Sequence, residues 1–120
     1  MKAFMLPSRR STLAKDKVNA YLGFCVKARK IVLGSGAIDT LRGGVHLILV
    51  CSSAGKNTFK LALKYKNRFA CPLMICKCGL EYAVNKQNCK IAAVKDLNLA
   101  KAIVANACEE YEIYAGGVEN

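Results

Sequence analysis

The sequence of 120 residues has few of the side chains that most enzymes use for proton transfer. Only eight residues are Asp or Glu, and they are scattered or gathered in "EEYE" near the C-terminus, with no pairing typical of acid/base catalysis. His46 is the single imidazole, and it sits in an apolar run, where histidine is more often structural than catalytic. We therefore expect no enzymatic activity.

Long apolar runs are also missing. The longest is the five residues from Leu47 to Cys51, whereas a membrane-spanning helix needs about 20. The apolar patch in "MKAFMLPSRR" ends at Pro7 and is shorter than the core of a signal peptide, about 7 to 15 residues. These features predict a cytoplasmic protein with no membrane partner.

Seven cysteines are present, at positions 25, 51, 71, 76, 78, 89 and 108, and none forms a CxxC pair. Without an export signal, reduced thiols are more common than a disulfide framework. Two interpretations remain: small core residues, or a zinc site assembled from Cys71, Cys76, Cys78 and Cys89. The spacing favours core residues, so we expect neither a metal nor another cofactor.

Positive charge is abundant. Nineteen Lys and Arg residues against eight Asp and Glu give a net charge of +11, which attracts polyanions such as RNA. Residues 1–14 have little periodicity and predict a mobile basic arm. Lys56, Lys60, Lys64 and Arg68 recur every fourth residue, either as a solvated helix face or as part of a binding surface.

Strand and helix patterns alternate along the rest of the chain. An amphipathic helical stripe begins at Val18, and strand-length apolar runs follow at 45–51, 72–78 and 90–95, with a shorter one at 31–33. Helical patterns lie between the first two runs and after the last, from Asp96 to Tyr111. The pattern predicts one α/β domain over residues 15–114, a sheet of roughly four strands, and a frayed tail at 115–120.

The stretch "VLGSGAIDTLRGG", residues 32–44, resembles a phosphate-binding turn. A dinucleotide fingerprint fails because Asp39 stands at the third glycine, and no GxxxxGK motif followed by Ser or Thr is present. Two alternatives stay open. The turn begins a helix whose N–H groups, with Arg29 and Lys30, hold one phosphate of a larger polyanion, or it is a tight turn at positive φ.

Three segments, "LGFCVKARKIVLGSG", "LILVCSSAGKNT" and "LEYAVNKQNCKIAAVKDLNLAKAI", resemble the L-seven-Ae family of ribosomal and kink-turn RNA-binding proteins, in particular its small bacterial branch. The resemblance covers residues 17–107 in colinear order, and its last segment is the most specific. It implies a three-layer α-β-α sandwich with a mixed sheet of about four strands.

The resemblance also implies an RNA-binding surface built around the glycine turn. The family reads kink-turn RNA through an Asn, a Glu and a Lys that follow this glycine. Gly34 matches the glycine, but Gly36, Ala37 and Thr40 stand at the three reader positions. We therefore expect an RNA-binding surface at the glycine turn that lacks the three side chains with which the family recognises kink-turns.

Two further contact regions follow from the same resemblance. In the loop "CSSAG", Ser52 and Ser53 replace an acidic pair of the family, and in "KCGLEYAV" Leu80 matches while Glu81 replaces a glycine. The expected RNA-binding residues are Arg29, Lys30, Gly34, Ser35, Gly36, Ala37, Thr40, Ser52, Ser53, Lys56, Lys77 and Leu80.

The sequence thus predicts a small cytoplasmic RNA-binding protein of the ribosome or of another ribonucleoprotein, in contact with structured RNA and with neighbouring proteins. The alternative is a protein-interaction module of a ribonucleoprotein that keeps the fold without contacting RNA. A basic surface around Gly34 would favour the first, and a neutral surface with an apolar patch would favour the second.

Overall fold

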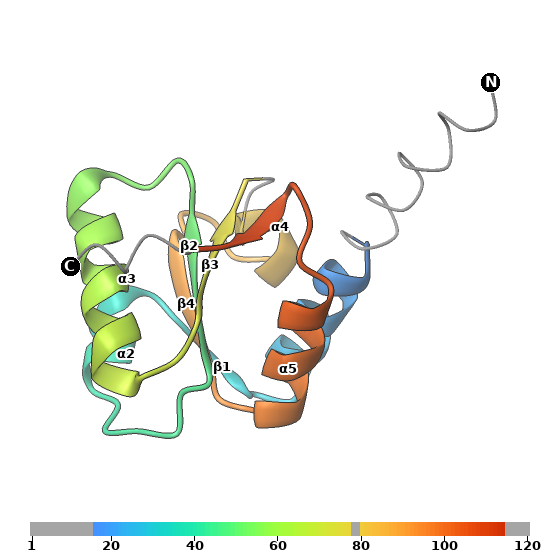
Figure 1. Cartoon of the computed structure of the whole chain (residues 1–120), viewed down its shortest axis with the longest axis horizontal. Helices are drawn as coiled ribbons and strands as arrows, with labels where there is room; N and C mark the ends of the chain where they lie inside the picture. The colour runs from blue at the N-terminus through green and yellow to red at the C-terminus, as the bar shows by residue number, and fades with distance from the viewer. Residues whose placement is uncertain (1–15, 78–79, 115–120) are drawn as a thin grey trace, which may run out of the picture.

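The computed structural model describes residues 16–77 and 80–114 and shows helices on both sides of a central sheet (Figure 1). The elements are a helix whose described part covers residues 16–27, β1 (Ile31–Leu33), α2 (Ser35–Asp39), β2 (Leu47–Cys51), α3 (Lys56–Phe69), β3 (Leu73–Cys76), α4 (Leu80–Val84), β4 (Ile91–Val94), α5 (Leu97–Ala105) and β5 (Tyr111–Ile113). The expected basic arm at 1–14 and the tail at 115–120 lie outside the described residues.

The predicted α/β sandwich is confirmed, but the sheet has five strands instead of four, in the order β1-β4-β2-β3-β5. β2 and β3 are parallel, and the other neighbours are antiparallel, so the sheet is mixed. β1, β2 and β3 therefore all run in the same direction. Their ends meet at one side of the sheet and their starts at the other.

The fifth strand corrects the prediction of a helix that continues to Tyr111. α5 stops at Ala105, and β5 then pairs antiparallel with β3, with Tyr111 opposite Cys76. Three residues are too few to show the alternation that identifies a strand in a sequence. The strand forms because β3 offers an open edge and because the buried Tyr111 side chain donates its hydroxyl hydrogen to Asn19 in the first helix.

Each face of the sheet has its own apolar core. The helix at 16–27, α4 and α5 pack on one face, with Leu22, Leu80 and Ile103 fully buried. α2 and α3 pack on the other face through Ile38 and Tyr65. The two groups of helices lie on opposite sides of the sheet in Figure 1. This arrangement is the three-layer α-β-α sandwich that the resemblance implied.

The apolar pattern of the strands follows from these two cores. Every residue of β2 and β4 is buried, because alternate side chains point into opposite layers. Leu49 of β2 enters the layer with α5, and Val50 enters the layer with α3. The predicted N-cap at Asp96 is confirmed, since its carboxylate accepts a hydrogen bond from the N–H of Leu99 at 2.9 Å.

Within the described residues, no helix has both the length and the apolar character needed to cross a bilayer.

Candidate nucleic-acid interface

The strand directions bring several of the predicted contact segments to one side of the sheet. β1, β2 and β3 end there at Leu33, Cys51 and Cys76, and β4 begins there at Ile91. We call this side the carboxyl edge, and the opposite side, where β1, β2 and β3 begin, the amino edge. Neighbouring strands are about 4.8 Å apart, so the segments after the three strands lie within a span of roughly 15 Å.

Most of the predicted RNA-binding residues lie at the carboxyl edge. The glycine turn follows β1, the Ser52–Ser53 loop follows β2, and Lys77 follows β3. Lys56 also lies there, because it opens α3 directly after the loop that leaves β2. The side chains of Ser52, Ser53, Lys56 and Lys77 are exposed, as are Gly36 and Ala37. The structure thus joins residues that are up to 43 positions apart in the sequence.

Lys90 is a residue of this edge that sequence reasoning missed. It precedes β4, and β4 lies between β1 and β2, so Lys90 stands between the glycine turn and the serine loop. Its ammonium group donates a hydrogen bond to Ser53 Oγ at 3.0 Å. A basic residue directly before a buried strand was the available signal, but the sequence does not show which strands flank that strand.

Ser53 links Lys90 to a thiol. Ser53 Oγ lies 3.1 Å from Cys51 Sγ. Burial by itself raises the pKa of the Cys51 thiol, but hydrogen bonds with Ser53 and with the backbone of Leu80, together with the charge of Lys90, outweigh burial and bring the pKa below its ordinary value of 9.0. The serine loop is therefore held by Lys90, which precedes β4, and by Cys76 at the end of β3, whose carbonyl accepts from the N–H of Ser52 at 2.9 Å.

The glycine turn has the positive φ of the second local alternative, and it also leads into a short helix. Gly34 has φ 91° and ψ 145°, a backbone conformation that suits glycine, and its N–H donates to the carbonyl of Ile91 at 3.0 Å. That N–H is therefore not available to a phosphate. α2 has only five residues, so few peptide dipoles add along its axis. Attraction of an anion to this edge must come mainly from lysine side chains.

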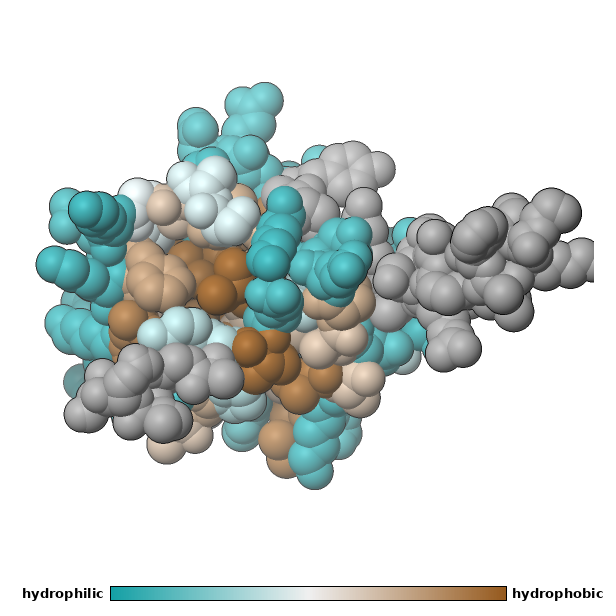
Figure 2. Space-filling view, turned by 45° about the horizontal axis from the view of Figure 1, so that its top comes forward, coloured by the Kyte–Doolittle hydropathy of each residue, from teal (hydrophilic) through white to brown (hydrophobic). Residues whose placement is uncertain are grey.

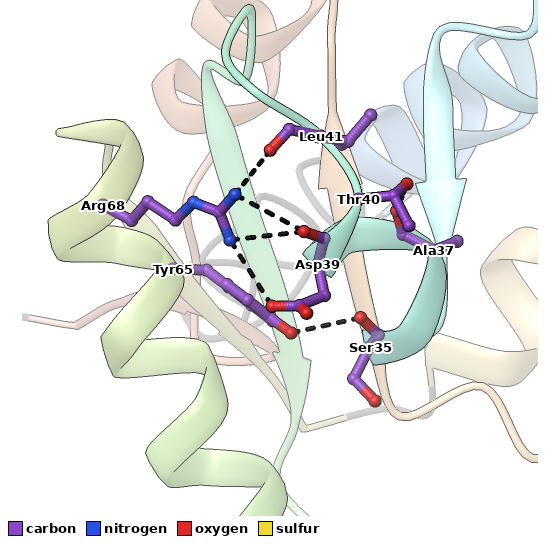
Figure 3. A network of polar contacts seen from close by, with 7 residues as sticks. All are labelled: Ser35, Ala37, Asp39, Thr40, Leu41, Tyr65 and Arg68. Atoms are coloured by element: carbon purple, nitrogen blue, oxygen red, sulfur yellow. Dashed lines mark hydrogen bonds and ion pairs between the residues drawn. The ribbon is translucent and has the colours of Figure 1, made fainter.

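Contacts between α2 and α3 fix the orientation of the turn (Figure 3). The Tyr65 hydroxyl donates to the carbonyl of Ser35 at 3.1 Å, so the first residue of α2 is tied to the middle of α3. At the other end of α2, the Arg68 guanidinium donates to the carbonyl of Leu41 at 2.8 Å and lies 3.4 Å from the Asp39 carboxylate. The turn is thus anchored at both ends of its short helix.

The side chains of four expected contact residues do not belong to this surface. Leu80 is completely buried in the core next to α5, so its side chain presents no surface to a ligand. Thr40 caps the far end of α2, where its hydroxyl donates to the carbonyl of Ala37. Arg29 and Lys30 precede β1 at the amino edge, where the carbonyl of Lys30 accepts from the N–H of Lys95. Three extended residues lie between Lys30 and Gly34, so the two are four residue steps, or about 13 Å, apart.

Charge at the carboxyl edge is only partly neutralised. Lys77 forms an ion pair of 3.0 Å with Glu112, and both side chains are about half exposed. In residues 16–77 and 80–114, neither Lys56 nor Lys90 has an acidic partner within ion-pair distance. The part of this edge next to the glycine turn is therefore the more strongly positive part.

Among the described side chains, no three His, Cys, Asp or Glu groups come close enough to hold a metal ion. Cys78, one of the four cysteines considered for zinc, lies outside the described residues. The six described cysteines are free thiols, and five of them are buried. Burial raises the pKa of both Cys25 and Cys71 to about 11.

Comparison with known proteins supports the fold. No protein-family model and no curated protein matches the chain. A solved structure of a protein of unknown function from Bacillus halodurans is similar, with a TM-score of 0.64 and 24% sequence identity. The match covers 75% of this chain and 95% of the other. At this level of identity the likeness shows a shared fold.

Proposed function

We propose that this chain is a small cytoplasmic RNA-binding protein of the ribosome or of another ribonucleoprotein, and that it contacts RNA through its carboxyl edge. The observation that carries the proposal is the meeting of Lys56 and Lys90 with the glycine turn and the serine loop at this edge. A positive surface beside small exposed residues lets a sugar-phosphate backbone approach closely. The net charge of +11 favours the same kind of partner.

The side chains at this edge suit phosphate and sugar contacts better than base readout. Lys56 and Lys90 offer ammonium groups, and Ser52 and Ser53 offer hydroxyl groups. The positions where the similar family carries its Asn, Glu and Lys readers are occupied by Gly36, Ala37 and Thr40. We therefore propose recognition of RNA shape through the backbone, with weak discrimination between a kink-turn and other structured RNA.

A salt titration with matched variants tests this proposal. Binding of a kink-turn RNA and of its unkinked control is measured at 50 to 200 mM salt for wild type and for two double variants. In one, Lys56→Gln and Lys90→Gln change the carboxyl edge; in the other, Arg29→Gln and Lys30→Gln change the amino edge. Each lost phosphate contact lowers the slope of log K against log salt by about 0.7 to 0.9.

The carboxyl-edge variant is expected to lose up to two such contacts, and the amino-edge variant none. Equal losses in the two variants would show general attraction by net charge and would contradict a defined site. A protein that binds neither RNA, at any salt concentration in the range, would point to the alternative of a protein-interaction module without RNA contact.

A further inference from the structure

An apolar groove lies beside α3, on the face of the sheet that carries only α2 and α3 among the described helices. Its volume is about 580 Å³. Phe59 and Leu63 of α3 and Ile75 of β3 form its apolar floor, and Lys56 and Lys60 of α3 line its rim. Figure 2 shows a hollowed brown area bordered by pale residues and, along part of its margin, by teal ones. We call this feature the α3 groove.

The groove exists because the helices do not cover the two sides of the sheet equally. On one side, three described helices pack over the five strands. On the other side, α2 contacts β1 and β4, and α3 contacts β2 and β3. Ile75 is consequently only half buried, although it lies in the middle of β3. An apolar strand face next to a helix is normally covered by a further helix.

The rim of the groove is positively charged. α3 contains no acidic residue, and Lys56 and Lys60 are one turn apart on its groove side. Neither lysine has an acidic partner within ion-pair distance in the described part of the chain. A second copy of this chain fits poorly, because each copy carries a net charge of +11 and the two would repel.

We propose that the α3 groove binds an amphipathic helix of a partner protein, with apolar side chains at i, i+3 or i+4, and i+7, and with Asp or Glu beside them. The apolar side chains would contact Phe59, Leu63 and Ile75. The carboxylates would meet Lys56 and Lys60 at the rim. Helices recognise apolar grooves in this way in many complexes, and complementary charge fixes their orientation.

The floor of the groove favours a peptide over RNA. Leu63 and Ile75 are aliphatic and offer no ring on which a base can stack. The one aromatic side chain in the lining, Phe59, makes an edge-to-face contact with Tyr114 at 5.6 Å and 76°. The groove and the carboxyl edge share Ser52 and Lys56, which line both. Lys60, Leu63 and Ile75 belong to the groove and not to the RNA-contact set, so changes at these residues test the peptide site separately.

The test is a selection of random peptides of about 16 residues, long enough for four helical turns, displayed on phage and captured on the full chain. The most enriched peptides are synthesised and titrated by fluorescence anisotropy against wild type and three variants. Lys60→Glu reverses a rim charge, and Leu63→Ala removes part of the floor. Lys64→Glu is the matched control, because Lys64 is exposed on the same helix and does not line the groove.

We expect enriched peptides with the stated apolar spacing and an excess of acidic residues. Their affinity should fall roughly tenfold with Lys60→Glu and three- to tenfold with Leu63→Ala, and less than twofold with Lys64→Glu. Melting curves and a titration of the same variants with RNA accompany these measurements. An unchanged RNA affinity in Lys60→Glu would separate the groove from the carboxyl edge.

Four results would overturn the proposal. Selection could yield no acidic amphipathic peptide, or the control variant could weaken binding as much as Lys60→Glu does. Leu63→Ala could reduce the affinity for RNA while no peptide binds, which would assign the groove to bases instead. Sedimentation that detects a dimer of wild type and a monomer of folded Leu63→Ala would assign it to a second copy of the chain.

Discussion

Two glycines of the same turn are expected to respond in opposite ways to substitution. Gly34 has φ 91°, so any side chain there is strained, although the space around it is open. Gly36 lies inside α2, is exposed, and has no atom within 4 Å of the position of an added Cβ. A side chain at Gly36 should therefore leave folding intact and occupy the space that an RNA backbone would need.

The size of each effect follows from these conformations. Gly34→Ala should lower the free energy of unfolding by about 1–3 kcal/mol, the cost of a side chain in a region that glycine almost alone adopts. In a domain of this length, that corresponds to a melting temperature lower by roughly 4–12 °C. Gly36→Leu should raise the free energy of unfolding by about 0.5–1 kcal/mol, because leucine favours a helix more than glycine does.

Gly36→Leu, which should stabilise the fold, is expected to weaken RNA binding. If the backbone approaches the turn closely, Gly36→Leu removes about two polar contacts of about 1 kcal/mol each, which corresponds to roughly thirtyfold weaker binding. Gly43→Leu is the matched control. Gly43 is also exposed and open, but it lies before β2 at the amino edge.

The assay combines thermal melting with an RNA titration at constant salt. If folded Gly36→Leu binds RNA as tightly as wild type, no RNA backbone lies against the turn, and the predicted contact is wrong. Equal weakening by Gly43→Leu would refute it as well, because the loss would not depend on the edge that carries the new side chain.

Three further predictions concern the core and the helix termini. Leu80→Ala should cost about 2–5 kcal/mol in urea denaturation, because Leu80 is fully buried, whereas a surface residue would lose far less. Asp96→Ala should cost about 1 kcal/mol by the same assay, through loss of the N-cap bond to Leu99, while Asp96→Asn should retain most of it. The pKa of the buried Cys25 and Cys71 thiols is raised from 9.0 to about 11, so the folded state favours their protonated form. Their contribution to the free energy of unfolding is complete below pH 9 and is lost as the pH rises toward 11; the double variant Cys25→Ala, Cys71→Ala should show a smaller fall over that range.

Local patterns in the sequence determined much of the fold. The stripe from Val18 to Cys25 predicted a helix, and the fully apolar runs predicted buried strands, because each pattern depends only on which side chains avoid water. The sequence did not predict β5, because its three residues pair with a strand 35 or more positions away in the chain. Pairing of this kind depends on an available edge, which no local pattern records.

The candidate interface was predictable only in part. Composition by itself indicated a polyanion as partner, since charge is a sum over residues and needs no structure. Arg29 and Lys30 were expected to act with the glycine turn because they lie close to it in the sequence. However, the short strand β1 runs from the amino edge to the carboxyl edge, so these two residues and the turn lie on opposite sides of the sheet. The strand order brings Lys90 to the carboxyl edge beside the glycine turn, because β4 lies between β1 and β2.

The sequence by itself determined the helix at 16–27, the helix α3, the start of α5, the buried strands and the sign of the charge, since these follow from the side chains of each segment. The tertiary structure alone decided which segments meet at the carboxyl edge, why Leu80 belongs to the core, and where α3 leaves part of the sheet face uncovered. These features depend on strand order and on the packing of layers. Both arise from contacts between residues far apart in the chain.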